Sequence, residues 1–385
     1  MKKVLFRGPV LTQSGYGVHS RQVARWLLSR KDVDVKFIVT PWGDTPWILD
    51  KNLHEGLIGQ VMERTVGSDY KADVSFQLQL PNEWDAKLAH KNVGITASVE
   101  SDRSNLEWLS ACNSMTAVVF PSEHSRSSVK FNGEIKVPSH VIPESFIDEI
   151  SNVEERKMSD FETSFNFLVF GQLTGSNPYN DRKNLLFTIK WLCEVFKDDP
   201  NVGIVMKTNC GRNTKIDRNL VIRTVKSVLA EVRKGPYPKI HLVHGEMNDK
   251  GVASLYKDPS IKALVSLTRG EGFGLPILEA AASGVPVIAT NWSAHVEFLK
   301  HLKFITIDYS LVPVHQTRVD GKIFVQGSKW AEPDENDFKK KVMKFRNSSS
   351  APREWAQEGA NIIREKYCFS EIAKKYDEAF GELLT

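Results

Sequence analysis

The sequence predicts an α/β fold built from two Rossmann-like domains. Short runs of β-branched and aromatic residues alternate with helical patterns along the chain, which is typical of parallel α/β layers. One polar stretch near the middle interrupts the alternation, and glycine-rich loops lead into helices in both halves. A chain of 385 residues is long enough for two or three domains with substantial cores.

Each expected strand is a short run rich in β-branched or aromatic residues, bounded by turn-forming residues. In the first half we expect strands at 3–6, 35–39, 74–78, 93–97, 117–120 and 140–142, with helices at 18–29 and 123–131. In the second half we expect strands at 167–170, 203–208, 240–244, 263–266, 287–289 and 304–307, with helices at 184–196, 216–234 and 248–256. Residues 151–160 are polar and lack a sheet pattern, so a linker is expected there.

The composition is that of an ordinary soluble globular protein, with 41% hydrophobic and 25% charged residues. The formal charge is +4, and opposite charges balance over residues 1–150, so no domain-wide basic face is expected there. Cys112, Cys193, Cys210 and Cys368 lack the spacing of a zinc site or a redox dithiol, and the N-terminal residues lack an apolar signal core. No apolar run approaches the ~20 residues that span a bilayer. We therefore expect a cytoplasmic protein without a transmembrane segment.

The most informative motif is residues 269–280, Arg-Gly-Glu-Gly-Phe-Gly-Leu-Pro-Ile-Leu-Glu-Ala. It places Glu271 and Glu279 eight positions apart across a glycine loop that becomes a helix at about 277–283. Gly272 and Gly274 permit a tight turn and close approach of a ligand to the backbone. Pro276 suits the first helical position.

This loop predicts a nucleotide-sugar site rather than a pair of hydrolytic carboxylates. The first amides of a helix are unpaired and its dipole is positive there, so a diphosphate over 275–277 would find donors without a metal. Glu279 can accept from two ribose hydroxyls, and Glu271 can reach the sugar beyond the phosphates. We take Gly272, Phe273, Gly274 and Leu275, together with Glu279, as donor-binding residues.

Together with residues 281–290, the motif resembles the Glu-x7-Glu signature of the retaining family 4 glycosyltransferases, the glycosyl transferases group 1. The resemblance implies the glycosyltransferase-B fold, with two Rossmann-like domains and a cleft between them. It implies an N-terminal, acceptor-side domain of residues 1–155 plus 370–385, because the last helix crosses back. The nucleotide-sugar-binding domain is then expected at residues 156–369.

A second motif places two cations at the start of a helix. Phe170-Gly171-Gln172-Leu173 ends a strand, and Arg182 and Lys183 follow before the next helix. Many family members carry an arginine at the place of Gln172, whereas other branches use an Arg-Lys pair that these two residues match. Their expected role is to neutralise charge on the leaving nucleoside diphosphate, which is typically a large catalytic term. With these cations and the helix amides directed at the diphosphate, a metal is unnecessary, so we expect no cofactor and no metal.

The first glycine loop contains Gly15 and Gly17 and opens a helix after the first strand. The dinucleotide fingerprint fails at its third position, which is Ser20. The loop resembles the N-terminal glycine loop of the family, which implies contact with the donor phosphate. His19 is an acceptor-side candidate, with an ordinary helix-start histidine as the alternative.

Two further stretches, residues 93–103 and 120–125, follow strands at the edge where open α/β sheets bind ligands. Glu100 is the acidic group that we expect nearest the reacting centre, with a carboxylate satisfied by Arg103 as the alternative. Residues 77–84 lack the histidine that many relatives hold there, and Trp84 is a second acceptor-side candidate, with loop packing as its alternative.

Two positions receive structural roles. Ser293 is expected to cap a helix. Residues 330–334 match a family turn that we interpret as structural.

The resemblance implies a retaining, metal-independent hexosyl- or pentosyltransferase. Its donor would be a nucleoside-diphosphate sugar and its acceptor a glycan or lipid-linked saccharide. Two alternatives stay open: a phage-type DNA glycosyltransferase acting on hydroxymethylated bases, and a noncatalytic sugar-nucleotide-binding protein. A peripheral membrane contact also stays open, because many relatives use lipid acceptors.

Overall fold

The computed structural model describes residues 1–155, 161–174 and 177–385. These residues form two compact units. Unit 1 comprises residues 1–145, 320–325 and 369–385, and unit 2 comprises residues 146–319 and 326–368. The units therefore divide at 145/146, ten residues before the boundary expected from the sequence, and unit 1 gains the segment 320–325. The expected linker at 151–160 lies partly outside the described residues, and its first residues end the short helix α5 (Glu149–Asn152).

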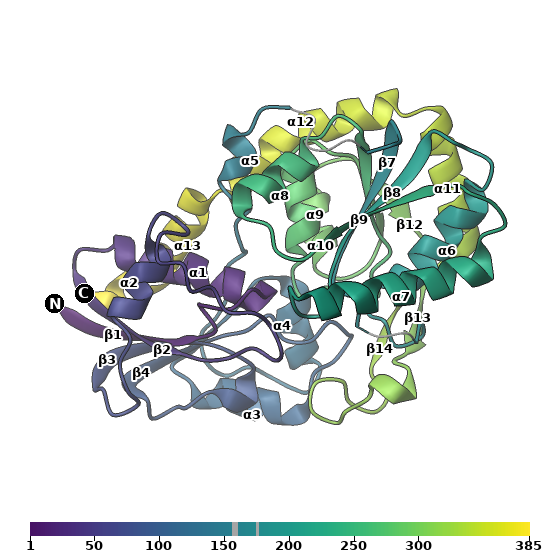
Figure 1. The fold of residues 1–385 in the computed structure, drawn as a ribbon. Coiled ribbons are helices and arrows are strands. Elements are labelled where there is room, and N and C mark those ends of the chain that lie inside the picture. Colours follow the sequence, from purple (N-terminus) through teal and green to yellow (C-terminus); the bar gives the residue numbers. More distant parts are fainter. Residues whose placement is uncertain (156–160, 175–176) are drawn as a thin grey trace. The chain divides into compact units, whose positions relative to one another are not determined.

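Unit 1 is built on a six-stranded parallel sheet with the strand order β2-β1-β3-β4-β5-β6 (Figure 1). Its strands are β1 (Lys2–Gly8), β2 (Val33–Val39), β3 (Ala72–Leu78), β4 (Ala89–Ile95), β5 (Ala117–Phe120) and β6 (Ser139–Val141). Its helices are α1 (Gly15–Ser29), α2 (Leu57–Glu63), α3 (Leu106–Ser114), α4 (Glu123–Lys130) and α13 (Phe369–Leu384), with a 3-10 turn at Pro81–Glu83.

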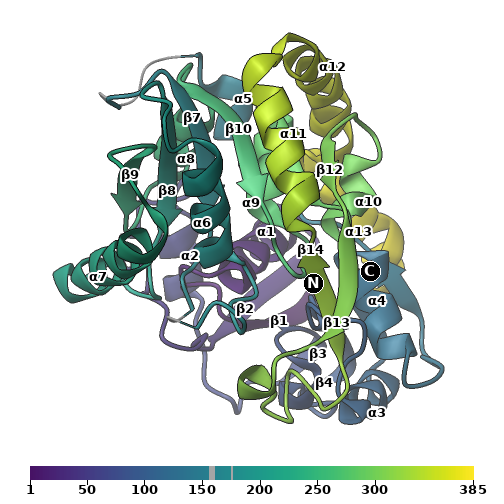
Figure 2. The same cartoon turned by 90° about the vertical axis from the view of Figure 1, so that its right-hand side faces the viewer.

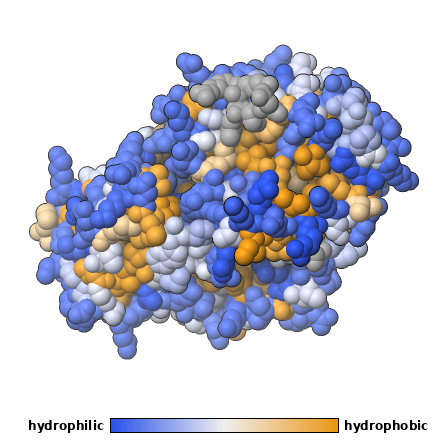
Figure 3. All heavy atoms as spheres, viewed as in Figure 1, coloured by the Kyte–Doolittle hydropathy of each residue, from blue (hydrophilic) through white to orange (hydrophobic). Residues whose placement is uncertain are grey.

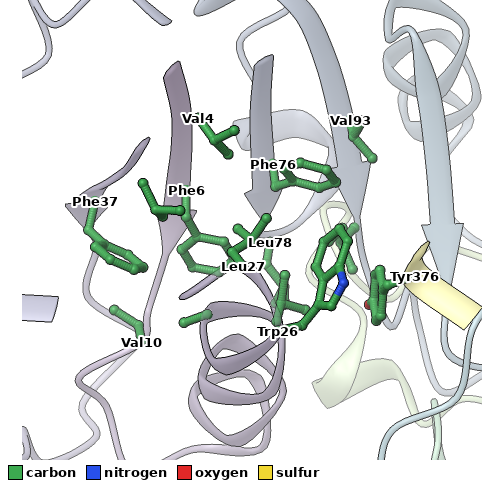
Figure 4. Close-up of a cluster of buried hydrophobic side chains, with 14 of the residues drawn as sticks. Val4, Phe6, Val10, Trp26, Leu27, Phe37, Phe76, Leu78, Val93 and Tyr376 are labelled. Carbon is green, nitrogen blue, oxygen red and sulfur yellow. The ribbon is translucent and has the colours of Figure 1, made fainter. Parts of the chain in front are cut away.

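The last helix, α13, completes the core of unit 1 beside α1 (Figures 1 and 4). The ring of Tyr376 stacks on Trp26 at a centroid distance of 4.8 Å, and the ring of Phe380 meets Phe76 edge-on at 5.5 Å. The indole N–H of Trp26 donates to Asp377 at 2.9 Å. Large buried aromatic side chains supply much of the free energy of a core, so unit 1 depends on this final helix.

Unit 2 has a second six-stranded parallel sheet, in the order β12-β11-β10-β7-β8-β9. Its strands are β7 (Phe165–Phe170), β8 (Val202–Thr208), β9 (Lys239–His244), β10 (Ile261–Ser266), β11 (Val287–Thr290) and β12 (Ile305–Ile307). An antiparallel pair, β13 (Tyr309–Pro313) and β14 (Lys329–Pro333), follows β12.

Helices pack on the sheet of unit 2 and on one another. α11 packs against α6 and β12, and α12 packs against α9 (Figure 2). The helices are α6 (Leu185–Val195), α7 (Lys215–Val232), α8 (Asp249–Tyr256), α9 (Leu275–Ala282), α10 (His295–Leu299), α11 (Glu335–Asn347) and α12 (Ser350–Tyr367), with a 3-10 turn at Gln316–Arg318.

The two parallel sheets confirm the predicted α/β fold with two Rossmann-like domains. Every strand expected from the sequence is present. Residues 330–334 are not a turn: most of them form β14, and Asp334 caps α11 by accepting from the amide of Asp337. The helices α2, α3 and α5 and the β13–β14 pair were not expected.

Hydrophilic residues cover most of the surface shown in Figure 3, and hydrophobic residues gather in separate areas on both units. Large exposed apolar side chains include Trp47 and Leu49 in unit 1 and Ile216 in unit 2. Among the helices that the structure describes, none has the length and hydropathy of a membrane span.

Candidate functional site

The loop before α9 adopts the tight turn that its glycines predict. Gly274 has a φ of +104° and precedes the first residue of the helix, and a side chain there would start 3.1 Å from His295. The helix begins at Leu275, two residues before the expected start, and the amides of Ile277 and Leu278 donate to the carbonyl of Gly274. The positive end of the α9 dipole therefore lies at this loop. The ring of Phe273 packs in the core at 5.5 Å from Phe298, so only its backbone is available to a ligand.

Glu271 lies in this loop between the two cations of the second motif. Lys183 Nζ is 2.7 and 2.8 Å from the two carboxylate oxygens, and Arg182 Nη1 is 3.3 Å from one of them. Arg182 also donates to the carbonyl of Gly270 at 2.6 Å. Burial by itself would raise the pKa of Glu271, but the charges of Lys183 and Arg182 outweigh it and lower the pKa to about 2. Glu271 is therefore ionised at neutral pH.

The two cations lie just before α6 rather than inside its first turn. The buried carboxylate of Asp181 accepts the amides of Lys183 at 3.1 Å and Leu185 at 2.7 Å. A carboxylate at a helix start is favourable for the dipole, so Asp181 offsets the unfavourable position of the cations. Burial raises the pKa of Asp181, although these amides and Arg269 act in the opposite direction.

Arg269 holds the segment that carries the cations. Its side chain is fully buried, and its guanidinium donates to both oxygens of Glu332 at 2.8 and 3.0 Å. It also donates to the carbonyls of Pro178 at 2.7 Å and Asp181 at 2.8 Å, while its amide donates to the carbonyl of Arg182 at 2.8 Å. This role could not be predicted from the sequence, because Glu332 comes from β14, 63 positions further along the chain.

Ser293 and His295 brace the glycine loop from the other side. Ser293 does not cap α10, because it has a φ of +84° and the cap position is Ala294. Its hydroxyl instead accepts the amide of Glu271 at 2.9 Å. His295 is buried, its Nε2 lies 2.7 Å from the carbonyl of Thr290, and burial lowers the pKa of its ring.

Glu279 lies in the second turn of α9 in an apolar setting. The hydroxyl of Tyr256 lies 3.2 Å from a carboxyl oxygen of Glu279 and 3.0 Å from the carbonyl of Pro276. Burial raises the pKa of Glu279 to about 8, although the hydrogen bond from Tyr256 acts in the opposite direction. The ring of Tyr256 lies parallel to that of Phe170 at 6.1 Å. At neutral pH Glu279 is therefore largely protonated.

The glycines of the first loop have different surroundings. Gly17 cannot carry a side chain, because a Cβ would lie 2.0 Å from the carbonyl of Thr12, and its amide donates to the capping hydroxyl of Ser14. Gly15 is exposed and has open space around it.

Neither acceptor-side candidate is placed as expected. His19 is buried inside unit 1, 3.3 Å from the hydroxyl of Tyr376 and 3.8 Å from the carboxylate of Glu144, and burial lowers its pKa to about 3. The helix α13 covers it, so it cannot meet an acceptor. Trp84 packs its ring over Gly94, as the loop-packing alternative predicts.

Glu100 is half-buried after β4. Its neighbour Arg103 pairs with Asp102 at 2.9 Å and lies over the ring of Phe131. The role of Glu100 near a reacting centre stays a prediction.

The structure thus brings Arg182, Lys183, Glu271 and Glu279 together at the carboxyl edge of the unit 2 sheet, where open α/β sheets bind ligands. The candidates Gly15, Gly17, His19, Trp84 and Glu100 all lie in unit 1. Within the described part of the chain, no group of three or more His, Cys, Asp or Glu side chains could hold a metal ion.

Residues 228–317, which include Glu271 and Glu279, match the model of the family described as glycosyl transferases group 1. The matched segment carries the site described above, and it is similar to this family. It is 26% identical over 205 residues to the probable sucrose-phosphate synthase of Thermosipho melanesiensis. That match covers 52% of this chain and 39% of the relative, so the chain spans about two fifths of the length of the curated relative that it matches.

Three solved structures share the fold of this chain. A glycosyltransferase from Rickettsia africae has a TM-score of 0.67 at 14% identity, covering 100% of this chain and 99% of that one. Sucrose-phosphate synthase from Thermosynechococcus elongatus has a TM-score of 0.62 at 12% identity, with the same coverage. HepE from Anabaena, in complex with UDP-glucose, has a TM-score of 0.61 at 12% identity, covering 99% of this chain and 100% of that one. These likenesses establish the glycosyltransferase-B fold.

Proposed function

We propose that this protein is a retaining, metal-independent glycosyltransferase of the cytoplasm. It would move a sugar from a nucleoside-diphosphate sugar to a glycan or lipid-linked saccharide. The observation that carries the proposal is the convergence of Lys183 and Arg182 on Glu271, at the positive end of α9. That arrangement offers fixed cations and the positive end of the α9 dipole to a diphosphate, and Glu279 stands one turn further along the same helix.

The chemical step breaks the bond between the anomeric carbon and the diphosphate oxygen. Negative charge grows on the diphosphate as it leaves, and Lys183, Arg182 and the amides of the α9 loop stabilise it there. The acceptor oxygen attacks from the face that the diphosphate leaves, and its proton passes to the departing diphosphate. Glu271 is ionised at neutral pH. When a diphosphate binds Lys183 and Arg182 as well, the carboxylate of Glu271 accepts hydrogen bonds from the sugar hydroxyls.

The comparisons support the donor class. The HepE structure holds UDP-glucose, and a second HepE structure holds UDP and glucose. A noncatalytic nucleotide-binding protein would need Glu279 but need not retain the two cations, Arg182 and Lys183, beside Glu271. The pair of cations with Glu271 therefore favours the enzyme over that alternative.

The test is donor turnover in EDTA. Purified protein is incubated with a panel of nucleoside-diphosphate sugars, with and without saccharide acceptors, and the released nucleoside diphosphate and the transferred sugar are measured by mass spectrometry. We expect transfer in EDTA and its loss in Lys183→Ala. Lys190→Ala is the matched control, since Lys190 lies on the outer side of α6 with Glu194. Transfer that EDTA abolishes and magnesium restores would contradict the metal-independent mechanism, and nucleotide binding without any turnover would favour the noncatalytic alternative.

A further inference from the structure

A buried lysine at the end of β8 takes no part in the mechanism above. Lys207 is only 8% exposed, and its ammonium donates to the carbonyl of Gly245 and lies 5.9 Å from the ring centre of Phe170. An ammonium carries three N–H donors, so two of them have no protein acceptor among the described residues. No carboxylate of those residues lies within ion-pair distance of Lys207, and burial lowers its pKa, which Glu246 offsets only in part.

This environment differs from that of other lysines in unit 2. Lys183 is paired with Glu271, and Lys339 is paired with both Glu194 and Glu335. Burying a charge is costly unless it is paired and hydrogen-bonded. Packing alone does not account for a cation at the place of Lys207, where a methionine would fill similar space at lower cost. The unmet donors point to a ligand with an acceptor group.

The order of the strands shows which part of a nucleotide would reach Lys207. The sheet runs β10-β7-β8-β9, and the loop before α9 follows β10. Neighbouring strands lie ~4.8 Å apart, so the end of β8 is about 10 Å from the end of β10. That separation is comparable to the length of a nucleoside. A ligand with its diphosphate at α9 would therefore extend its base toward Lys207.

Two aromatic rings, of Tyr256 and Phe170, lie between the α9 site and Lys207. Tyr256 contacts Glu279 with its hydroxyl and lies parallel to Phe170 with its ring, and Phe170 in turn neighbours Lys207. The residues along the sheet edge thus follow the order of a nucleoside diphosphate. The cations and the positive end of α9 come first, the ribose carboxylate second, and Lys207 last.

We propose that Lys207 donates a hydrogen bond to a ring carbonyl of the donor nucleobase and thereby selects the base. This inference rests on the proposed function. An ammonium can only donate, so it matches the keto oxygen of uracil, thymine or guanine and opposes the exocyclic amine of cytosine or adenine, which also donates. The expected donor is a keto-base nucleotide sugar.

The test compares the affinities of nucleotides that differ in their base and does not depend on turnover. Calorimetry measures the dissociation constants of UDP, GDP, CDP and ADP for the wild type, Lys207→Met and Lys262→Met. We expect the wild type to bind the better keto nucleotide about 10- to 100-fold more tightly than CDP and ADP, as for a hydrogen bond to a charged group. Lys207→Met should reduce that preference to about threefold or less. Lys262→Met should keep it, because Lys262 lies near the start of β10, away from the carboxyl edge of the sheet, and donates to the carbonyl of Pro259, which precedes that strand.

The outcomes separate this inference from the proposed function. A wild type that binds none of the four nucleotides overturns both. Nucleotide binding with an unchanged base preference in Lys207→Met, or with no preference in the wild type, overturns only the role of Lys207. If Lys207→Met does not fold, Lys207→Gln replaces it. An amide can donate or accept, so Gln should improve CDP relative to UDP, and an unchanged ratio rejects the proposal.

Discussion

Glu271 and Glu279 lie in one loop and helix, eight positions apart and both buried, yet they hold opposite charge states. Glu271 lies against Lys183 and Arg182, which lower its pKa to about 2. Glu279 contacts the hydroxyl of Tyr256 and pairs with no cation of the described residues, and burial raises its pKa to about 8. Burial acts in the same direction on both carboxyls, so the neighbouring charges decide which one is ionised.

The difference separates the two functions proposed for the pair. Glu271 is a carboxylate throughout the physiological range, so it can accept from sugar hydroxyls and balance the cations when no diphosphate is bound. Glu279 must lose a proton before it can accept fully from two ribose hydroxyls. Nucleotide binding at Glu279 is therefore expected to release a proton, whereas binding at Glu271 is not.

The largest effect that tests this comparison is expected at the cations. Lys183→Ala and Arg182→Ala should each lower kcat by roughly 10² to 10³, with a smaller change in the donor KM, because the diphosphate charge grows in the transition state. Steady-state kinetics measures both values, with Lys190→Ala as the control. If the lysine served only to pair with Glu271, the double variant Lys183→Ala/Glu271→Gln would recover the activity of Glu271→Gln alone, and this recovery would contradict a role on the diphosphate.

The next effect separates the two glutamates by ligand. Glu279→Ala should weaken free nucleoside diphosphate and its sugar conjugate alike, by about 1.5 to 3 kcal/mol, since both carry the ribose. Glu271→Gln should weaken the conjugate and its turnover, and leave the free nucleoside diphosphate much less affected. Calorimetry with the two ligands checks this. Equal losses for both ligands in both variants would mean that the glutamates do not divide ribose and sugar between them.

Much of the fold and the core of the site could be predicted from the sequence. The strands were found because buried parallel strands read as short β-branched runs, and Glu271, Glu279, Arg182 and Lys183 because they flank recognisable loops and helix starts. The pKa difference could not be predicted. Lys183 lies 88 positions from Glu271, and Tyr256 lies 23 positions from Glu279, so the partners become neighbours only in the folded sheet.

The errors have the same origin. His19 follows a glycine loop at a helix start, but its ring meets Tyr376, 357 positions away, inside the core. Residues 330–334 matched a family turn, yet most of them pair with β13 as a strand, and Pro333 ends that strand at the edge of a two-stranded pair. Lys207 and Arg269 were missed because a cation beside a strand usually points to solvent.

A third effect, of about tenfold, is expected in the pH dependence of nucleotide binding. The affinity of the wild type for a nucleoside diphosphate should rise as the pH increases toward and past 8, because ionised Glu279 accepts the ribose hydroxyls. Tyr256 and Asp249 are the other titratable groups that act on Glu279. Calorimetry in buffers of different ionisation enthalpy measures the proton release directly. Glu279→Gln should abolish the part of the pH dependence and proton release that Glu279 causes. If the affinity of Glu279→Gln still changes with pH as much as that of the wild type, the pH dependence comes from the ligand's own phosphates.

The last effect is expected in the stability of unit 2, and its dependence on pH has opposite signs for the two glutamates. The pKa of Glu279 is higher in the folded state than in the unfolded chain, so its contribution is fully present below the unfolded pKa near 4.5 and is lost as the pH rises through 8. The pKa of Glu271 is lower when folded, so its contribution is present above 4.5 and is lost as the pH falls toward 2. Urea unfolding from pH 5 to pH 9 should therefore show the wild type losing stability relative to Glu279→Gln, by up to about 4 kcal/mol, because each pH unit between 5 and 8 contributes about 1.4 kcal/mol. The wild type and Glu271→Gln should keep a constant difference over the same range, because Glu271 stays ionised throughout. If the stability of Glu279→Gln changes with pH in parallel with that of the wild type, Glu279 is already ionised at neutral pH. The two carboxyls would then differ in their contacts and not in their charge.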